Sequence, residues 1–259
     1  GDMPRWKLRM NRKLQASTID HLAALICVDT NYINWCHSEL PGRASWRAKL
    51  RYVPNYAETL EFQPGQGREH DGRIHILFPR RMDGTADTDL IEHDRGAGFM
   101  LQAAHELRKR GVDFHVVFCG KGGLRDRIQQ WATDHGFGDQ LDIREVAFEQ
   151  MPNLYEEADV VVVPSLGHEG TSLSAVEGMA SGKPVVVSHI GGLCNIVIPG
   201  VNGYVADLIP SSLADAIQDA ARFNPLQDQA VLERVREQLG RARWEQRVWS
   251  ILHETLQLK

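Results

Sequence analysis

Residues Val160–Val187 read VVVVPSLGHEGTSLSAVEGMASGKPVVV, with a helical pattern between two valine runs. A valine run that ends at a proline is typical of a strand buried on both faces of a parallel sheet. Apolar residues then recur at helical spacing until a glycine and a proline end the helix: Leu173, Val176 and Ala180, then Gly182 and Pro184. A second strand is expected at 184–188. The segment therefore predicts a strand-helix-strand unit of an α/β fold.

Two glutamates lie in this segment, Glu169 before the predicted helix and Glu177 within it. Glu177 shares the apolar stripe, where an unpaired, buried carboxylate is unfavourable and needs donors such as the hydroxyls of a ligand. Glu169 precedes small residues whose backbone N–H groups are free at the helix start and face an anion or a sugar oxygen. We therefore expect a pocket at the carboxyl end of the first strand. The alternative, in which Glu177 pairs with a Lys or Arg and Glu169 is solvated, suits an isolated glutamate better than this pair.

The stretch resembles the signature of retaining glycosyltransferases of family 4, also called group 1, which are two-domain GT-B enzymes with nucleotide-sugar donors. Their pattern is PS, a short spacer, EG, a small or aromatic residue, GL and then EAMA-GKPVV. Here it runs Pro164-Ser165, Glu169-Gly170-Thr171-Ser172-Leu173 and Glu177 to Val186. Ser172 stands where the family has glycine and Gly178 where it has alanine, and both changes leave the backbone room to approach a ligand.

The resemblance implies a role for each matched residue. Glu169 would lie at the donor sugar as a catalytic residue, and Glu177 would bind the ribose hydroxyls. The same pocket would contain the small residues that follow the first glutamate: Gly170, Thr171, Ser172 and Leu173.

Upstream, residues 73–82 read RIHILFPRRM, which predicts a buried strand ending in two arginines. The family has Gly-Arg there and Lys-Gly at the start of the next helix, and this Arg and Lys hold the donor diphosphate. By that resemblance Arg81 and Arg95 are the catalytic phosphate ligands, since Arg95 keeps the charge and can bond phosphate oxygens bidentately. Arg80 replaces the glycine, as in the PRR variant of bacterial surface-polysaccharide enzymes, and we count it among the substrate-binding residues.

Between these arginines, residues 83–94 form the acidic segment DGTADTDLIEHD. Its carboxylates lack the spacing of a metal site, so we expect a solvated insertion that is mobile without donor rather than a magnesium site. We expect no metal and no cofactor.

The rest of the chain alternates strands and helices, as a doubly wound parallel sheet requires. Strands are expected at 114–119 and 141–148, a helix at 124–135, and a turn and strand at 202–205. The resemblance places Phe148 where the nucleotide base is met, although a phenylalanine is more often part of a core. Asn195 stands where the family has an acidic residue, so an amide would supply those hydrogen bonds.

The length of 259 residues is short for two complete Rossmann-like halves. We therefore expect the donor-binding half of a GT-B fold: residues 1–53 as the end of an acceptor-side domain with its linker, 54–240 as the donor-binding domain, and 241–259 as a closing helix. The basic stretch 5–13 has two interpretations. It is either a face for an anionic membrane or a lipid-linked acceptor, or, as we prefer, a helix exposed by the missing half.

Composition narrows the function little further. Hydrophobic residues make up 42% of the chain, charged residues 24%, and the net charge is −5, so bulk charge indicates no nucleic-acid partner. The four cysteines show no metal spacing and are expected to be free thiols. We expect a cytoplasmic protein, with a peripheral contact at the inner face of the membrane as an alternative.

The sequence thus predicts the donor-binding part of a retaining glycosyltransferase that takes a nucleotide-sugar donor and a carbohydrate or lipid-linked acceptor, in bacterial polysaccharide or glycoconjugate synthesis. The chemistry would need Arg81 and Arg95 to stabilise the leaving diphosphate while Glu169 positions the sugar. Two other classes stay open: a non-catalytic nucleotide-sugar-binding module, and a nucleotide-sugar epimerase or a phosphorylase of the same architecture.

Overall fold

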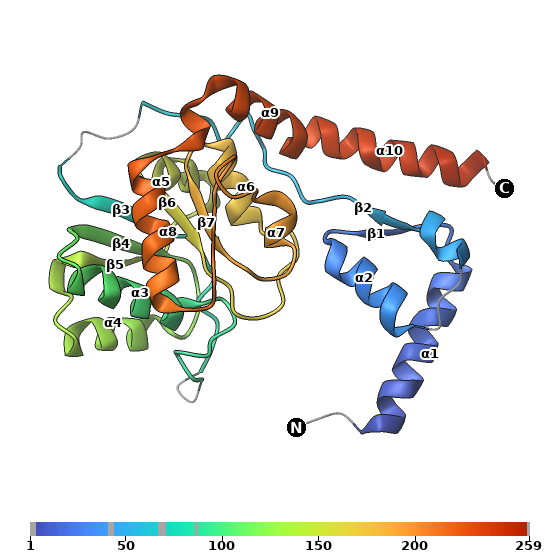
Figure 1. Ribbon diagram of the computed structural model, residues 1–259, viewed down its shortest axis with the longest axis horizontal. Helices are drawn as coiled ribbons and strands as arrows, with labels where there is room; N and C mark the ends of the chain where they lie inside the picture. The colour runs from blue at the N-terminus through green and yellow to red at the C-terminus, as the bar shows by residue number, and fades with distance from the viewer. Residues whose placement is uncertain (1–3, 41–43, 67–70, 86–87, 258–259) are drawn as a thin grey trace.

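The computed structural model describes residues 4–40, 44–66, 71–85 and 88–257. Its main body is a parallel sheet of six strands in the order β5-β4-β3-β6-β7-β8 (Figure 1). The strands are β3 (Ile74–Phe78), β4 (Phe114–Cys119), β5 (Leu141–Arg144), β6 (Val160–Val163), β7 (Val185–Ser188) and β8 (Tyr204–Ala206). The chain builds outward from β3 to β5, returns to β6 beside β3, and then builds the other way. This confirms the predicted doubly wound α/β fold, and its switch point lies between β3 and β6.

The four valines of β6 show why the sheet forms. All four are buried, but Val160 and Val162 belong to one core cluster and Val161 and Val163 to the other. Successive side chains of a strand point to opposite faces, so a run of valines fills both layers. The central strand is thereby covered on both faces, as the sequence predicts.

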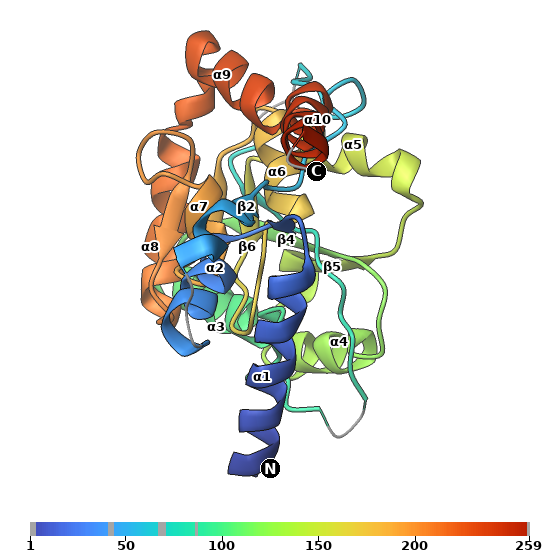
Figure 2. The ribbon, with the colours of Figure 1, turned by 90° about the vertical axis from the view of Figure 1, so that its right-hand side faces the viewer.

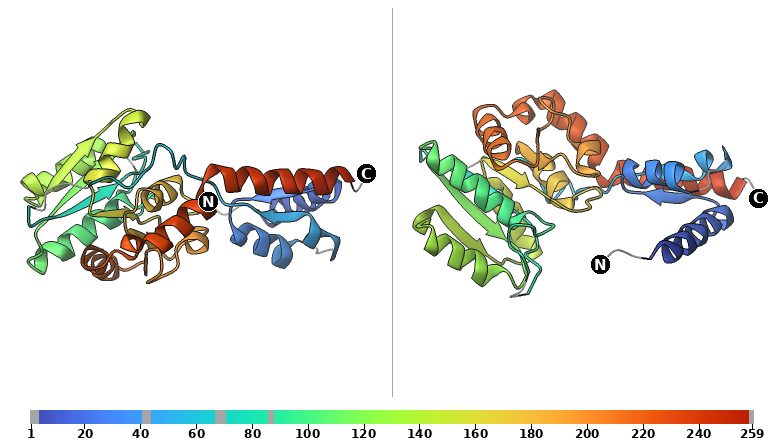
Figure 3. Two further views of the ribbon diagram at one scale, coloured as in Figure 1. Left: turned by 90° about the horizontal axis from the view of Figure 1, so that it is seen from above. Right: turned by 60° about the horizontal axis from the view of Figure 1, so that its bottom comes forward.

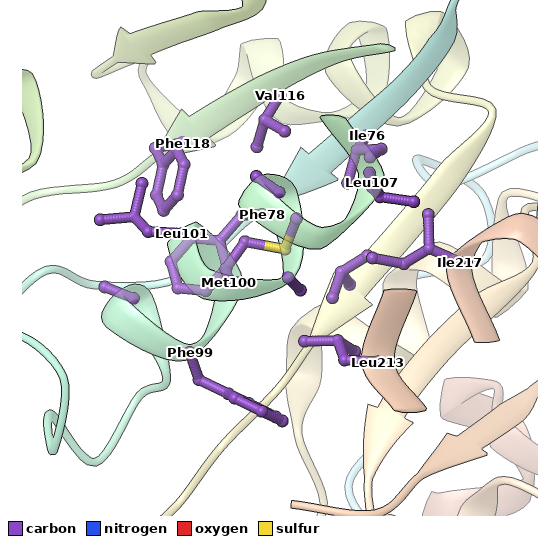
Figure 4. Packing of buried hydrophobic residues seen from close by; sticks show 14 of the residues in the cluster. Ile76, Phe78, Phe99, Met100, Leu101, Leu107, Val116, Phe118, Leu213 and Ile217 are labelled. Atoms are coloured by element: carbon purple, nitrogen blue, oxygen red, sulfur yellow. The ribbon is translucent and has the colours of Figure 1, made fainter. Parts of the chain in front are cut away.

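Helices cover each face of the sheet. On one face lie α3 (Ala97–Lys109), α4 (Arg125–Asp134) and α8 (Pro210–Arg222). Apolar side chains of α3 pack with those of β3, β4 and α8 (Figure 4), and α8 itself lies over β6, β7 and β8. On the other lie α5 (Met151–Glu157), α6 (Leu173–Ala180) and α9 (Gln229–Leu239), with the short α7 (Leu193–Ile196) beside them. The predicted helix at 124–135 is confirmed as α4, and the helix after Ser172 as α6.

A smaller lobe precedes the main body. It consists of α1 (Arg5–His21), β1 (Leu25–Cys27), α2 (Thr30–Glu39), a 3-10 turn at Ala44–Ala48 and β2 (Leu50–Tyr52), with β1 and β2 paired in parallel. Buried Trp46 anchors its own small cluster and donates its indole N–H to Asp20 at 2.9 Å. The lobe lies at one end of the molecule, on the right in Figure 1 and toward the viewer in Figure 2. The predicted boundary at 53/54 falls just after β2 and stays a prediction.

The last helix, α10 (Arg241–Gln257), runs from the main body to this lobe (Figure 3). An ion pair of 2.6 Å between Arg51 of β2 and Glu254 of α10 joins the two. On α1, Trp6, Met10 and Leu14 are exposed on successive turns. Within the described ranges, no helix is long and apolar enough to cross a bilayer.

Two predicted strands end earlier than expected. The strand predicted for 73–82 stops at Phe78, because Pro79 cannot donate to a ladder. The strand predicted for 141–148 stops at Arg144, because its partner β4 ends at Cys119, which pairs with Arg144. Residues Phe148–Gln150 form a 3-10 turn instead. Of the turn and strand predicted for 202–205, the strand is β8, which runs from Tyr204 to Ala206.

Gly96 lies where α3 starts against the end of β6, and it provides a test of this packing. Its φ is +79°, and a Cβ there would overlap the carbonyl oxygen of Pro164. Gly111 has a similar φ of +70° but no atom within 4 Å of its Cβ position, so it is a matched control. We expect Gly111→Ala to lower the free energy of unfolding by about 1 kcal/mol and Gly96→Ala by about 3 kcal/mol or more, because a clash adds to the same backbone strain. Urea unfolding followed by tryptophan fluorescence measures both. Equal losses would show that the approach of α3 to Pro164 does not constrain the fold.

Candidate functional site

The loops that follow β3 and β6 meet at the carboxyl end of the sheet. These are the two strands at the switch point, where open α/β sheets bind their ligands. Arg80 and Arg81 follow β3, and Ser165 and Glu169 follow β6. The fold therefore brings the two predicted motifs together.

Glu169 lies at the centre of this site. Its Oε2 accepts hydrogen bonds from Arg80 at 2.5 Å, from Arg95 at 2.9 Å and from the Ser165 hydroxyl at 3.0 Å. Only 8% of the glutamate side chain is exposed. Two guanidinium groups surround one carboxylate, so the group carries a net positive charge at the point where an anionic ligand would meet it.

Arg80 is the buried member of this group, with 6% of its side chain exposed. Besides Glu169 it donates to the hydroxyls of Ser165 at 3.0 Å and Ser172 at 2.9 Å. Arg80 and Ser172 each replace a glycine of the family pattern, and one hydrogen bond joins these two departures. Ser172 accommodates the arginine that replaces the first glycine.

Arg81, in contrast, has 73% of its side chain exposed and pairs with Asp83 at 3.0 Å. The structure thus brings Arg80 to Glu169, whereas the resemblance assigns the clamp to Arg81. Arg95 keeps 41% of its side chain exposed while it bonds Glu169, so it remains accessible to a ligand.

Glu177 projects from α6 and has an uncharged partner. The Tyr155 hydroxyl donates to its Oε2 at 2.8 Å. No basic side chain pairs with Glu177 in the described part of the chain. Burial raises the pKa of Glu177, and the hydrogen bond from Tyr155 lowers it in part. Burial also raises the pKa of Tyr155 well above its ordinary value, so the phenol stays a donor.

A cavity of about 320 Å³ adjoins Glu177. It brings together three residues that the sequence analysis selected, Glu177, Leu173 and Phe148, with residues from distant parts of the chain: Asn55, Tyr56, Ala57, Glu58, Phe62 and Trp244. Phe148 is half-exposed and lies edge-on to Phe62 at 5.9 Å, so it is not a core residue. The ring centroids of Tyr56 and Trp244 lie 5.1 Å apart, and nothing in the local sequence of either residue links it to this pocket.

The residues between the two glutamates hold the small lobe in place. The Thr171 hydroxyl donates to the carbonyl of Val28 at 2.5 Å, and its own carbonyl accepts from Asn55 at 3.0 Å. Gly170 lies against Val28, where a Cβ would meet that side chain. Asn195 bonds Thr30 twice, accepting from its N–H at 2.9 Å and donating to its hydroxyl at 2.8 Å.

The acidic segment contributes backbone contacts rather than a cluster of ligands. The carbonyl of Asp94 accepts from the N–H groups of Leu166 and Gly167 at 2.8 and 3.2 Å. Residues 86 and 87 lie outside the described residues. Among those that are described, no three His, Cys, Asp or Glu side chains are grouped to hold a metal ion.

The family model for Glycosyl transferases group 1 matches residues 89–222, just over half of the chain. The chain belongs to this family. The resemblance in the sequence is therefore confirmed, and the residues of the match span the segment from the acidic loop to α8.

Relatives and solved structures agree. A D-inositol 3-phosphate glycosyltransferase of Paenarthrobacter aurescens is 34% identical over 152 residues, which are 56% of this chain and 35% of that one. An uncharacterised glycosyltransferase of Methanocaldococcus jannaschii is 31% identical over 168 residues, 62% of this chain and 38% of the relative. The chain thus spans little more than a third of the length of these relatives.

A structure of Anabaena HepE in complex with UDP covers 95% of this chain and 68% of its own, at 16% identity and a TM-score of 0.78. Sucrose-phosphate synthase of Thermosynechococcus elongatus has a TM-score of 0.75 at 20% identity over 96% of this chain and 62% of its own. These likenesses confirm the GT-B type of fold.

The pH dependence of stability tests the environment of Glu177. The folded chain raises the pKa of this carboxyl, so the protonated form is favoured in the folded state and that stabilisation is lost as the pH rises through the folded-state pKa. Glu177→Gln removes the titration. We expect the free energy of unfolding of the wild type to fall relative to that of Glu177→Gln as the pH rises above 4.5, the ordinary pKa of a glutamate.

Tyr155→Phe is the companion variant. It should cost about 1 kcal/mol at neutral pH and enlarge the pH-dependent loss, because the hydroxyl that lowers the pKa of Glu177 is gone. Chemical unfolding at several pH values measures all three proteins. If the wild type instead became more stable relative to Glu177→Gln as the pH rose, this result would contradict the buried environment of Glu177.

Proposed function

We propose that this chain is the donor-binding part of a retaining glycosyltransferase that transfers a sugar from a nucleotide-diphosphate sugar to an acceptor, in bacterial polysaccharide or glycoconjugate synthesis. The observation that carries the proposal is the group of Arg80, Arg95 and Glu169 at the switch point, next to a cavity that contains Glu177. The acceptor would be a carbohydrate or a lipid-linked sugar. Such a reaction would be cytoplasmic.

The cavity suits the nucleoside. Its volume of about 320 Å³ is within the range of small-molecule sites. Glu177 has one oxygen bonded to Tyr155, and its second oxygen has no hydrogen bond within the described residues. A ribose hydroxyl pair would supply the donors that a buried carboxylate needs. Phe148 and Trp244 offer apolar ring surface for the base. The UDP complex of HepE supports this assignment by analogy of fold.

The diphosphate would lie between this cavity and Glu169. Arg95 is accessible there, and the first backbone N–H groups of α6 have no side-chain cap, since the Ser172 hydroxyl accepts from Arg80 instead. Free N–H groups at a helix start favour phosphate oxygens.

The chemistry follows from these positions. When the bond between the anomeric carbon and the diphosphate oxygen breaks, its electron pair goes to the diphosphate. Arg95 would stabilise the charge that accumulates there, which lowers the energy of the transition state more than that of the bound donor. Glu169, held by Arg80, would face the sugar and offset positive charge on its ring.

Titration with nucleoside diphosphates tests the phosphate ligands. We expect Arg95→Ala to weaken binding by about 1.5 to 3 kcal/mol, the range for a charge-assisted hydrogen bond. Arg81→Ala is the matched control and should cost less than about 0.5 kcal/mol, since its exposed ion pair with Asp83 contributes little. A loss for Arg81→Ala as large as for Arg95→Ala would instead support the clamp that the resemblance assigns.

The two glutamates should divide the donor between them. We expect Glu177→Gln to weaken a nucleoside diphosphate and its sugar conjugate alike, by about 1 to 2 kcal/mol. Glu169→Gln should spare the plain nucleotide and reduce only the additional affinity that the sugar contributes.

The rise in melting temperature with each of the UDP-, GDP-, ADP- and dTDP-sugars shows which base the site binds. Calorimetry then compares the affinities of the variants for that nucleotide and its sugar. Loss of the plain nucleotide in Glu169→Gln as severe as in Glu177→Gln would contradict the division. A sugar that changes configuration without an acceptor would favour the epimerase.

A further inference from the structure

A second cavity, of about 500 Å³, lies on the linker between the two lobes. Tyr52, the last residue of β2, and Pro54 of the linker form one wall, and the next residues, 55–58, line the candidate nucleotide cavity. The helix α10 is likewise shared, because Arg247 lines the second cavity and Trp244 the first. The remaining walls come from α7, the turn after it, and α9.

Most of this lining is apolar: Pro54, Ile196, Ile198, Val201, Ala230, Val231, Val235 and Leu239. Ile198 and Val201 are large apolar side chains that are each about half exposed. Apolar surface gathered around a hollow gains free energy when a ligand removes it from water. The volume is that of a site for a drug-sized molecule.

Six polar residues also line the cavity, and two of them, Arg247 and Tyr52, bear most directly on its ligand. Arg247 donates to the carbonyl and side-chain oxygens of Gln238 at 3.3 and 3.0 Å. Within residues 4–40, 44–66, 71–85 and 88–257, no carboxylate pairs with it. Tyr52 lies close enough to Arg247 for the two to interact electrostatically, and within these ranges its hydroxyl makes no hydrogen bond. Asp29 also acts on Tyr52, but it caps α2 and does not line the cavity.

The other charges near the cavity are mostly positive. Arg234, which also lines the cavity, pairs with Glu237 at 2.8 Å, and Arg243 lies close enough to act on Arg247. A partly buried guanidinium without a carboxylate is an incomplete ion pair, and an anion would complete it. A cationic ligand would be repelled here.

We propose that this cavity binds a small amphipathic anion, with an apolar body against Ile198, Val201 and Val235 and a single carboxylate or phosphate at Arg247 and Tyr52. The site is distinct from the nucleotide cavity and does not depend on the function proposed above. A fatty acid and an alkyl phosphate share this chemistry, and the experiment separates them.

The test is calorimetric titration of the full chain with decanoate and with decyl phosphate. Decanol and decyltrimethylammonium have the same chain without the negative charge. We expect both anions to bind at least roughly tenfold more tightly than the uncharged and cationic probes. A roughly tenfold difference in affinity is what one charge-assisted hydrogen bond contributes. The tighter of the two anions identifies the head group. Binding should persist in saturating UDP.

Two variants with matched controls locate the site. Arg247→Met keeps the apolar stem and should weaken the anions roughly tenfold, whereas Arg243→Met, one turn earlier and outside the lining, should change the affinity by less than about threefold. Ala230→Trp fills the cavity mouth and should abolish binding, whereas Ala221→Trp, on the exposed end of α8, should not. Unchanged melting temperatures show that the variants are folded.

Several results would overturn the proposal. These are no binding of either anion, equal binding of decanol, equal loss in Arg247→Met and Arg243→Met, or displacement by UDP. The last result would place the probes in the nucleotide cavity. Failure of UDP to bind at all would bear on the proposed function and not on this site.

Discussion

The carboxylate of Glu169 is shared between Arg80 and Arg95 at the point where the sheet reverses its order. This ion pair joins the loop after β3, the segment before α3 and the loop after β6. Through Ser172 it also reaches the start of α6. A buried carboxylate that lost these partners would be strongly destabilising, so the four segments are held to one geometry. The close approach of Gly96 to Pro164 is part of the same constraint, because it brings Arg95 to the loop of Glu169.

The sequence predicted the sheet well because valine runs are unambiguous. A strand buried on both faces needs apolar residues at every position, and β6 and β7 supply them. Ends of strands were predicted less well, since the end of β5 depends on where a neighbouring strand stops. Residues 145–148 could not be assigned without knowing that β4 ends at Cys119.

The site was also predicted only in part, because the local sequence shows some of its residues and not the contacts between distant segments. The spacing of Glu169 and Glu177 around the start of α6 is local and could be found. The local sequence does not show which of the adjacent Arg80 and Arg81 turns inward. Neighbouring side chains of an extended chain point to opposite sides, and Pro79 ends the strand, and with it the alternation, just before these residues. Tyr56 and Trp244 reach the cavity, and Tyr155 reaches Glu177, from separate parts of the chain, and no spacing in the sequence indicates that they meet.

The hydrogen bond between Arg80 and Ser172 limits the order in which such a site can change over generations. From an ancestor with glycine at both positions, an arginine that arrives first is buried without the hydroxyl that Ser172 now offers it. A serine that arrives first leaves only an uncharged hydroxyl without a partner, which is less unfavourable than a buried guanidinium that lacks one. The permissive step is therefore the serine. A lineage that has acquired the arginine can then no longer lose that serine freely, so the two positions should be inherited together.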